Sequence, residues 1–312
     1  MRKQLLLLPM AAVLLGLAGC DIEDIDFGGS ERYTQDFHYS YPLQPGGRVT
    51  VENFNGSVEI SGWDENSIEI SGTKYARTPE LRDALKIDIE HSSDSTYIRT
   101  VKPSDRRGNM GVKYIIKVPH RTQLDRISST NGSIRTTDIE GQARLKTSNG
   151  AVRATNLKGN LDAQTTNGGV DIQNLVGSAS LRTTNGRIHA EDVRGSMDAE
   201  TSNGGIAVRL AKPETGRPIK LQTTNGGIEL TLESMNQNEI RASTTNGGIT
   251  VHVPGGLGAN LVANTSNSTI STDFDVQTQG TTSKHHMEGK IGSGGPTIDL
   301  STSNGGIRLL RM

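Results

Sequence analysis

The sequence predicts an all-β chain, folded as a single-stranded β-solenoid of about 18–22 residues per coil with a degenerate β cap at its amino end. Three observations predict it: Asn-Gly steps recur every eighteen residues from Asn131 to Asn203 and at looser intervals after it, apolar and polar residues alternate between the steps, and only 32% of residues are hydrophobic and 4% aromatic. A fixed period near twenty residues is typical of a chain that stacks one small unit on the next. A thin interior of small aliphatic side chains, repeated in every coil, explains the shortage of bulky residues.

The first twenty residues have the pattern of a lipoprotein signal peptide. A basic start is followed by an apolar run at residues 5–17, too short to span a bilayer comfortably, and by small residues before Cys20. The pattern resembles a bacterial lipobox, so residues 1–19 are expected to be removed and Cys20 to carry palmitate-type acyl chains that anchor the protein in a membrane. Asp21 resembles an inner-membrane retention signal, which favours the periplasmic face of the inner membrane over the outer membrane. The alternative is an ordinary secretory signal with a chance cysteine.

The next two segments are expected to lead into the repeat. Residues 20–45 begin with acidic residues and glycines, which predicts a solvated tether. Residues 46–126 are expected to form the β cap, a degenerate start of the same body with one short helix at Pro79–Lys86 and Thr78 as its N-cap. The strands expected in this cap are Arg48–Val51, Ser57–Ile60, Ser67–Ile70, Lys86–Glu90, Tyr97–Val101 and Val112–Val118.

Bulky aromatic residues gather in the cap region, among them Phe54, Trp63, Tyr75 and Tyr114. They can close the amino end of the solenoid, which would otherwise expose unpaired backbone. They can also form an aromatic surface that binds carbohydrate. The closing role is favoured, and the regular repeats contain no tryptophan, phenylalanine or tyrosine.

Residues 127–312 contain the Asn-Gly repeat, interrupted by a loop insertion near 273–296. In the unit that starts at residue 143, two alternating segments flank a break at the Asn-Gly step, as two half-buried strands would. Core positions exchange size between neighbouring units: Ala143 and Leu145 in one unit correspond to Leu161 and Ala163 in the next. A large side chain stacked on a small one in the next coil fills a narrow interior without voids.

Two architectures are compatible with this alternation. Asn-Gly between alternating strands is a strong hairpin signal, so an antiparallel meander is possible. A meander would need about eighteen strands with a face left uncovered and edges left open, so the solenoid is favoured. The Asn-Gly step then becomes a corner, at which both residues are expected to adopt left-handed backbone conformations. The asparagines expected to stack in one hydrogen-bonded column are Asn131, Asn149, Asn167, Asn185, Asn203, Asn225, Asn246 and Asn304.

Few residues could carry chemistry. Asp162, Asp171 and Asp198 are expected to face outward, and they would support a polysaccharide-cleaving enzyme only if they shared one groove with no cation nearby. Arginines are expected beside them in neighbouring coils, which indicates a soluble charge ladder instead. His285 and His286 stand together in the insertion without further ligands, so no metal site and no cofactor are expected. The net charge of −1 gives no case for a nucleic-acid partner.

Several motifs point to a family. They are Val51–Gly56, Ile60–Asp64, Val118-Pro119 and the run of Thr/Ser-Asn-Gly-Gly-Ile units that ends at Ile307. On these motifs, residues 46–312 resemble the bacterial putative-adhesin family of β-strand-repeat proteins of unknown function. The resemblance implies a β-solenoid-like fold on a surface or envelope protein and implies nothing about activity.

These observations lead to one expected function and two alternatives. We expect a lipid-anchored cell-envelope β-solenoid that is not an enzyme and has a binding, adhesin-like or structural role. Its expected partners are the membrane and an envelope protein or polysaccharide. The first alternative is a β-helix enzyme acting on envelope or extracellular polysaccharide. The second is a scaffold that assembles end to end, because the last strand, Ile307–Met312, has no evident polar cap after it.

Overall fold

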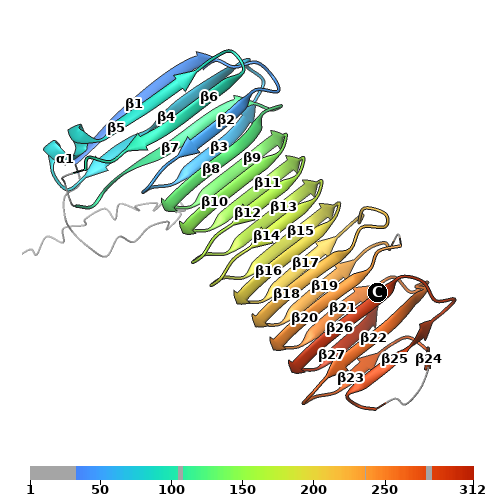
Figure 1. Ribbon diagram of the computed structural model, residues 1–312. Coiled ribbons are helices and arrows are strands. Elements are labelled where there is room, and N and C mark those ends of the chain that lie inside the picture. Colours follow the sequence, from blue (N-terminus) through green and yellow to red (C-terminus); the bar gives the residue numbers. More distant parts are fainter. Residues whose placement is uncertain (1–32, 105–107, 236, 279–282) are drawn as a thin grey trace, which may run out of the picture. The chain divides into compact units, whose positions relative to one another are not determined.

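Two long β-sheets account for most of the structure (Figure 1). The computed structural model describes residues 33–104, 108–235, 237–278 and 283–312. The expected signal peptide and the expected lipidation site, Cys20, lie outside the described residues. No helix among the described residues is long and apolar enough to cross a membrane.

The strands and the helix have the following bounds. Sheet A has thirteen strands, in spatial order β1 (Tyr33–Pro42), β4 (Ser67–Ala76), β7 (Met110–Pro119), β3 (Val58–Trp63), β9 (Ile134–Glu140), β11 (Val152–Lys158), β13 (Val170–Val176), β15 (Ile188–Arg194), β17 (Ile206–Leu210), β19 (Ile228–Leu232), β21 (Ile249–Val253), β27 (Ile307–Arg311) and β23 (Ile270–Thr272). Sheet B has fourteen strands, in spatial order β24 (Val276–Thr278), β25 (His286–Ile291), β22 (Ala259–Thr265), β26 (Thr297–Asn304), β20 (Ile240–Asn246), β18 (Ile219–Asn225), β16 (Met197–Asn203), β14 (Ala179–Arg182), β12 (Leu161–Gln164), β10 (Ala143–Asn149), β8 (Gln123–Asn131), β2 (Arg48–Glu52), β6 (Ser95–Val101) and β5 (Lys86–His91). The helix is α1 (Pro79–Ala84).

Each coil of the repeat contributes one strand to each sheet, and each strand pairs in parallel with its copies in the neighbouring coils. β10 pairs with β12 and β11 pairs with β13, both in parallel register. The solenoid is therefore confirmed, and the antiparallel meander is wrong for the repeat. Ala143 lies opposite Leu161 and Leu145 lies opposite Ala163, so a large residue meets a small one in the core, and all four are buried.

Buried threonines give the narrow core its few polar groups. The hydroxyl of Thr165 donates to the carbonyl oxygen of Gly150, one coil earlier, at 2.8 Å, and Thr183 donates in the same way to Gly168. Because a buried hydroxyl is costly without a partner, these bonds let a polar residue occupy the core at every corner.

The amino end is closed by antiparallel strands. β2 and β3 form a coil that lies between β6 and β7 on one side and β8 and β9 on the other. β4 and β1 extend sheet A, and β5 extends sheet B, all in antiparallel pairing. The expected tether is wrong over residues 33–42, which form β1 along the whole length of β4. Period-two alternation is present in this segment, but the solvated composition before it concealed the strand.

The aromatic residues of the cap are packed inside it. Tyr114 is fully buried and shares a 2.7 Å hydrogen bond with Thr100, while Phe54 packs against a small cluster that contains Met110. Trp63 is half-buried and donates from its indole nitrogen to the carbonyl oxygen of Ser67. This packing supports the closing role over a carbohydrate-binding surface. The helix α1 begins as expected, with the Thr78 hydroxyl accepting from the backbone of Leu81, and ends two residues earlier than expected.

The carboxyl end does not stop at an uncapped strand. β26 and β27, the last strands in the chain, lie between the coil of β20 and β21 and the coil of β22 and β23. The insertion near 273–296 is not a plain loop, because it supplies β24 and β25, and β25 pairs antiparallel with β22 (Figure 1). The expectation that Ile307–Met312 ends the stack is therefore wrong, and end-to-end assembly loses the observation that suggested it.

Candidate functional site

The repeated asparagines form one hydrogen-bonded column at the corner between the sheets. From Asn149 onward, each side-chain amide donates to the amide oxygen of the asparagine in the preceding coil at 2.7–2.9 Å, and Asn131 accepts the first of these bonds. The donors are Asn149, Asn167, Asn185, Asn203, Asn225, Asn246, Asn304 and Asn267. The expected left-handed backbone at this corner is wrong, because from Asn131-Gly132 onward neither residue of the step has a positive φ. The column is thus fully used in stacking and offers no reactive group.

A second column, not predicted from the sequence, stands at the opposite corner. Its backbone is left-handed, with φ of 58° at Asp138, 54° at Asn156, 56° at Asn174 and 51° at Asp192. Asn156 donates to Asp138 at 2.7 Å and Asn174 donates to Asn156 at 2.8 Å. Asp and Asn tolerate this conformation better than other residues that carry a side chain. The signal was available, since these residues also recur every eighteen positions.

The two glycines of each Asn-Gly-Gly step have different surroundings. A Cβ atom added to Gly226, the first glycine, would overlap the carbonyl oxygen of Gly204 in the preceding coil. A Cβ added to Gly227, the second glycine, would lie 3.4 Å from the nearest atom, the carbonyl oxygen of Gly248. The first glycine is therefore required by close stacking of the coils, whereas the second is not. Ser133, Ala151 and Arg187 occupy the second position in other coils.

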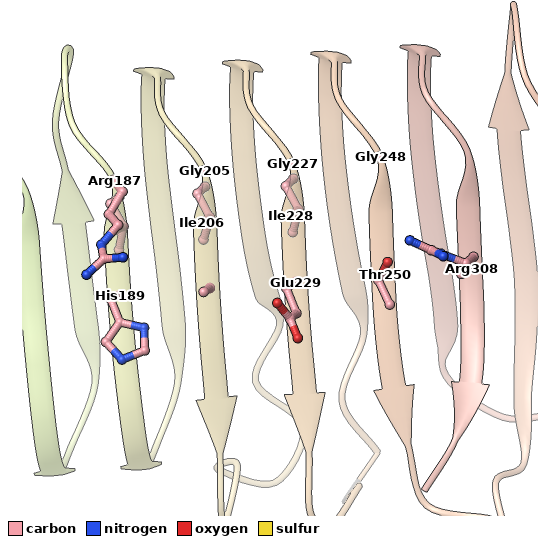
Figure 2. A pocket seen from close by; sticks show the side chains of 12 residues that line it. Arg187, His189, Gly205, Ile206, Gly227, Ile228, Glu229, Gly248, Thr250 and Arg308 are labelled. Atoms are coloured by element: carbon pink, nitrogen blue, oxygen red, sulfur yellow. The ribbon is translucent and has the colours of Figure 1, made fainter.

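These second glycines form the floor of a shallow trough on the outer face of sheet A. The trough has a volume of about 510 Å³ and crosses β15, β17, β19, β21 and β27. Gly205, Gly227 and Gly248 leave the backbone uncovered along its floor (Figure 2). Its remaining outward side chains are Arg187, His189, Ala207, Glu229, Thr250 and Arg308. With a spacing of about 4.8 Å between strands, the trough extends roughly 19 Å along the solenoid.

Arginines stand at both ends of the trough. Arg187 and Arg308 are exposed, and neither forms an ion pair with another described residue. Figure 2 shows Arg187 beside His189 at one end and Arg308 next to Thr250 at the other. Glu229 is the one carboxylate among the lining residues. The site thus offers an open, flat floor between hydrogen-bonding side chains with two uncompensated positive charges.

A family model described as Toastrack DUF4097 matches residues 48–267, more than half of the chain. The chain belongs to the Toastrack DUF4097 family. A search of curated proteins found no match.

Solved structures with distant similarity carry names that refer to adhesion and to lipid binding. A "putative cell adhesion protein" from Clostridium sporogenes is 13% identical with a TM-score of 0.25, covering 89% of this chain and 100% of its own. A "putative adhesin" from Bacteroides fragilis is 14% identical with a TM-score of 0.38, covering 89% and 97%. A "putative lipid binding protein" from Parabacteroides distasonis is 14% identical with a TM-score of 0.43, covering 90% and 98%. Similarity at this level transfers no function to the Toastrack chain.

The acidic residues that could have formed an enzyme site are separated in the Toastrack chain. Asp162 and Asp198 lie on sheet B, and Asp171 lies on sheet A. Asp198 also has Arg182 within 3.5 Å, and the same arginine reaches Glu200 at 3.4 Å. The three aspartates therefore do not share a groove free of cations, which was the condition for the enzyme alternative.

Asp162 belongs to a second groove, on the outer face of sheet B. This groove has a volume of about 740 Å³, and Arg144, Lys146, Arg126 and Glu52 also line it. Its floor is crowded by long side chains of both signs, and Glu52 is already engaged by Tyr97 at 2.9 Å and Arg126 at 3.5 Å. The glycine floor of sheet A is the more open surface.

The histidine pair serves the carboxyl-terminal cap. Nδ1 of His285 lies 2.8 Å from the carbonyl oxygen of Ser268, and Nδ1 of His286 lies 2.6 Å from the side-chain oxygen of Asn264. These contacts join the insertion to β22 and to the turn that follows it. Among the described residues, no group of three or more His, Cys, Asp or Glu is placed to hold a metal ion.

Proposed function

We propose that this Toastrack protein is a lipid-anchored β-solenoid of the cell envelope that binds an extended anionic polysaccharide along the trough of sheet A, without catalysing a reaction on it. The observation that carries the proposal is the row of second glycines. Other coils have serine, alanine or arginine at the same position, so the coil accepts a side chain there, although a Cβ atom on Gly205, Gly227 or Gly248 would lie 3.2–3.4 Å from the nearest atom. Their common effect is a floor free of side chains over several adjacent coils.

The chemistry of the trough suits a sugar chain. A flat floor of exposed backbone and small side chains accepts the flat face of a pyranose ring, and a length of roughly 19 Å accommodates several consecutive units. Arg187 and Arg308 can bind carboxylate or phosphate substituents in bidentate fashion. His189, Glu229 and Thr250 can bond to hydroxyl groups. Because the arginines have no acidic partner in the described residues, ligand binding does not have to break an existing ion pair.

The proposed place of action follows from the amino-terminal pattern. Lipid on Cys20 would hold the solenoid at a membrane surface, with the periplasmic face of the inner membrane favoured by Asp21. A non-catalytic binder in this position would tether or organise envelope polysaccharide.

A matched pair of substitutions tests the proposal. Gly227→Gln places a long neutral side chain on the floor of the trough, and Ala151→Gln places the same side chain at the same position of a coil outside it. Binding is measured with purified full-length protein on an array of acidic and neutral bacterial polysaccharides. We expect Gly227→Gln to weaken binding of the acidic polymers at least tenfold and Ala151→Gln to leave it unchanged. Equal binding by both variants, or no binding of any acidic polymer by the unmodified protein, would show that the trough is not the site.

A further inference from the structure

The edges of the two sheets are protected to very different degrees. Sheet B ends at β5, which has six residues with charged side chains at the alternate positions Lys86, Asp88 and Glu90, and at β24, which has three residues. Sheet A ends at β23, also three residues long, and at β1, which has ten. Short strands and charged side chains are the usual means of preventing edge-to-edge pairing. β1 has no lysine or arginine, and its single proline, Pro42, is its last residue.

No strand covers the outer edge of β1 among the described residues, and one side chain reaches it: Arg82 of α1 donates to the carbonyl oxygen of Thr34 at 3.3 Å. β1 pairs with β4 from Tyr33 to Pro42 and has no strand on its other side, where it forms the amino-terminal border of sheet A (Figure 1). Its side chains are exposed or half-buried throughout, and Tyr33 and Tyr39 are among the few exposed large hydrophobic residues, at 42% and 36%. A long strand with exposed aromatics and no neighbouring strand on one side is a template for another strand, and pairing along its full length would displace only the Arg82 side chain from Thr34.

The two faces of β1 carry different sets of side chains. Phe37 faces the core and contacts Tyr114 edge-on at 5.7 Å, so the odd-numbered residues lie on that side of the sheet. Asp36 and His38 lie on the opposite side. Each is held by β4, Asp36 by the Thr73 hydroxyl at 2.7 Å and His38 by the Ser71 hydroxyl at 2.9 Å. These bonds orient the acid and the imidazole side by side along the strand.

We propose that β1 pairs antiparallel with β1 of a second copy of this chain, in the register that places Phe37 opposite Phe37 of the second copy. In this register Asp36 of each copy lies opposite His38 of the other copy, so this pair occurs twice. Thr34 lies opposite Ser40, and Tyr33 lies opposite Tyr41. Polar pairs such as an acid opposite an imidazole, hydroxyl pairs and aromatic pairs are cross-strand combinations that stabilise antiparallel sheets. One two-fold axis satisfies all of them at once.

Other registers are less favourable. Opposed residues in an antiparallel pair must point to the same face, so the register can change only in steps that keep odd residues opposite odd ones. Centring the pair on Asp36 places the two carboxylates opposite each other. Centring it on His38 places the two imidazoles opposite each other and leaves Asp36 facing Ser40. The pairing of Asp36 with His38 therefore favours the register centred on Phe37 over these two.

The pairing closes on itself. A two-fold contact uses the same strand of both copies, so it produces a dimer and not a chain of molecules. The β1 pairing differs from end-to-end assembly, which would use the carboxyl end of the solenoid. That end is covered by β22 to β25. The β1 pairing is also independent of the trough, which lies on β15 to β27. Two anchored molecules joined in this way would present two troughs to the same polymer.

Cross-linking of the full-length protein in detergent tests the register. Thr34 and Ser40 are small and exposed, and the chain has a single natural cysteine, Cys20. Proteins carrying Thr34→Cys and Ser40→Cys, with tags of different size, are treated with a short thiol-specific cross-linker separately and as a mixture. We expect a cross-linked dimer in the mixture and none when either protein is treated alone, because two copies of Thr34 would be about 20 Å apart in this register. The unsubstituted protein controls for linkage through Cys20.

Analytical ultracentrifugation of the same full-length protein tests the charge pairing. His38→Asp places Asp36 opposite an aspartate and is expected to raise the dissociation constant of the dimer at least tenfold. The double variant Asp36→His with His38→Asp restores the pairing of an acid with an imidazole and is expected to return the constant to within about threefold of the original. Tyr39→Lys, an edge lysine, is expected to abolish the dimer. A matched Asp88→Lys substitution on β5 is expected to have no effect.

Three outcomes would overturn the proposal. The first is an unsubstituted protein that remains monomeric at all concentrations, as it would if another part of the same chain covers β1. The second is a dimer that survives Tyr39→Lys and gives no mixed cross-link, which would place the contact on another surface. The third is cross-linking of the Thr34→Cys protein with itself, which would indicate a different register.

Discussion

The side-chain amide of Asn185 donates a hydrogen bond to the amide oxygen of Asn167, 2.8 Å away and one coil earlier. Its own oxygen accepts from Asn203 at 2.9 Å. The same bond recurs along the column and always points toward the amino end of the solenoid, so each amide acts as donor and acceptor in one continuous chain. The repeated asparagines are therefore accounted for by the fold, without a ligand.

Replacing Asn185 by valine removes both of these bonds while retaining a residue that favours β structure. We expect the free energy of unfolding to fall by roughly 1 kcal/mol or more. Thr184→Val is the control, since Thr184 is an exposed neighbour whose side chain takes no part in the column. Chemical denaturation of both variants measures the difference. Equal midpoints for Asn185→Val and the original protein would show that the column contributes nothing to stability.

The two glycines of the Asn-Gly-Gly step should respond oppositely to alanine. Gly226→Ala drives a methyl group into the carbonyl of Gly204, which also accepts the Thr223 hydroxyl at 2.9 Å, so the coils must separate. We expect a loss of roughly 3 kcal/mol or more. Gly227→Ala meets only ordinary contacts and reduces the freedom of the unfolded chain, so we expect no loss, or a gain of about 0.5 kcal/mol. Thermal denaturation of the two variants measures the difference in stability, and similar losses in both would contradict the distinction between the two glycines.

The parts of this fold that the sequence predicts are those repeated in every coil. The period of the Asn-Gly step predicts the coil, and the exchange of Ala143 and Leu145 for Leu161 and Ala163 predicts which residues stack. Both signals succeed because each coil contacts only its neighbours, so contacts in space follow directly from the repeat. The same regularity was present at Asp138 and Asn156, where an unrecognised second column stands.

The ends of the solenoid could not be read in this way. β1 pairs with β4 across an intervening coil, and β26 inserts between strands that precede it in the chain. These pairings are not local and leave no periodic trace. The trough was also missed, because Gly226 and Gly227 look alike in the sequence. Only the distance to the neighbouring coil shows that a side chain is excluded at Gly226 and has room at Gly227.

The proposed membrane attachment rests on Cys20, which lies outside the described residues. We expect Cys20→Ser to release the protein from membranes, because in the proposed lipoprotein the acyl chains would be attached at that cysteine. Fractionation of cells into membrane and soluble parts, with and without detergent, provides the measurement. Continued dependence on detergent in the variant would refute lipid anchoring through Cys20.

The stability of the cap should fall at alkaline pH through Tyr114. Burial raises the pKa of its hydroxyl from 10.0 to about 12, and the hydrogen bond with Thr100 opposes this shift only in part. A folded-state pKa above the unfolded one means that the folded chain holds the proton more tightly. Its contribution is therefore complete below pH 10 and is lost as the pH rises from about 10 to 12, by roughly 2–3 kcal/mol in total.

Tyr114→Phe separates this effect from the titration of other groups. The variant loses the 2.7 Å bond to Thr100, so at pH 8 it should be less stable than the original protein by roughly 1 kcal/mol. Between pH 10 and 12 it should lose less stability than the original, because phenylalanine has no proton to release. Urea denaturation at pH 8, 10 and 11 tests both expectations, with Tyr39→Phe on the exposed edge as the control. Parallel loss of stability in the original and the Tyr114→Phe protein would mean that another group controls alkaline unfolding.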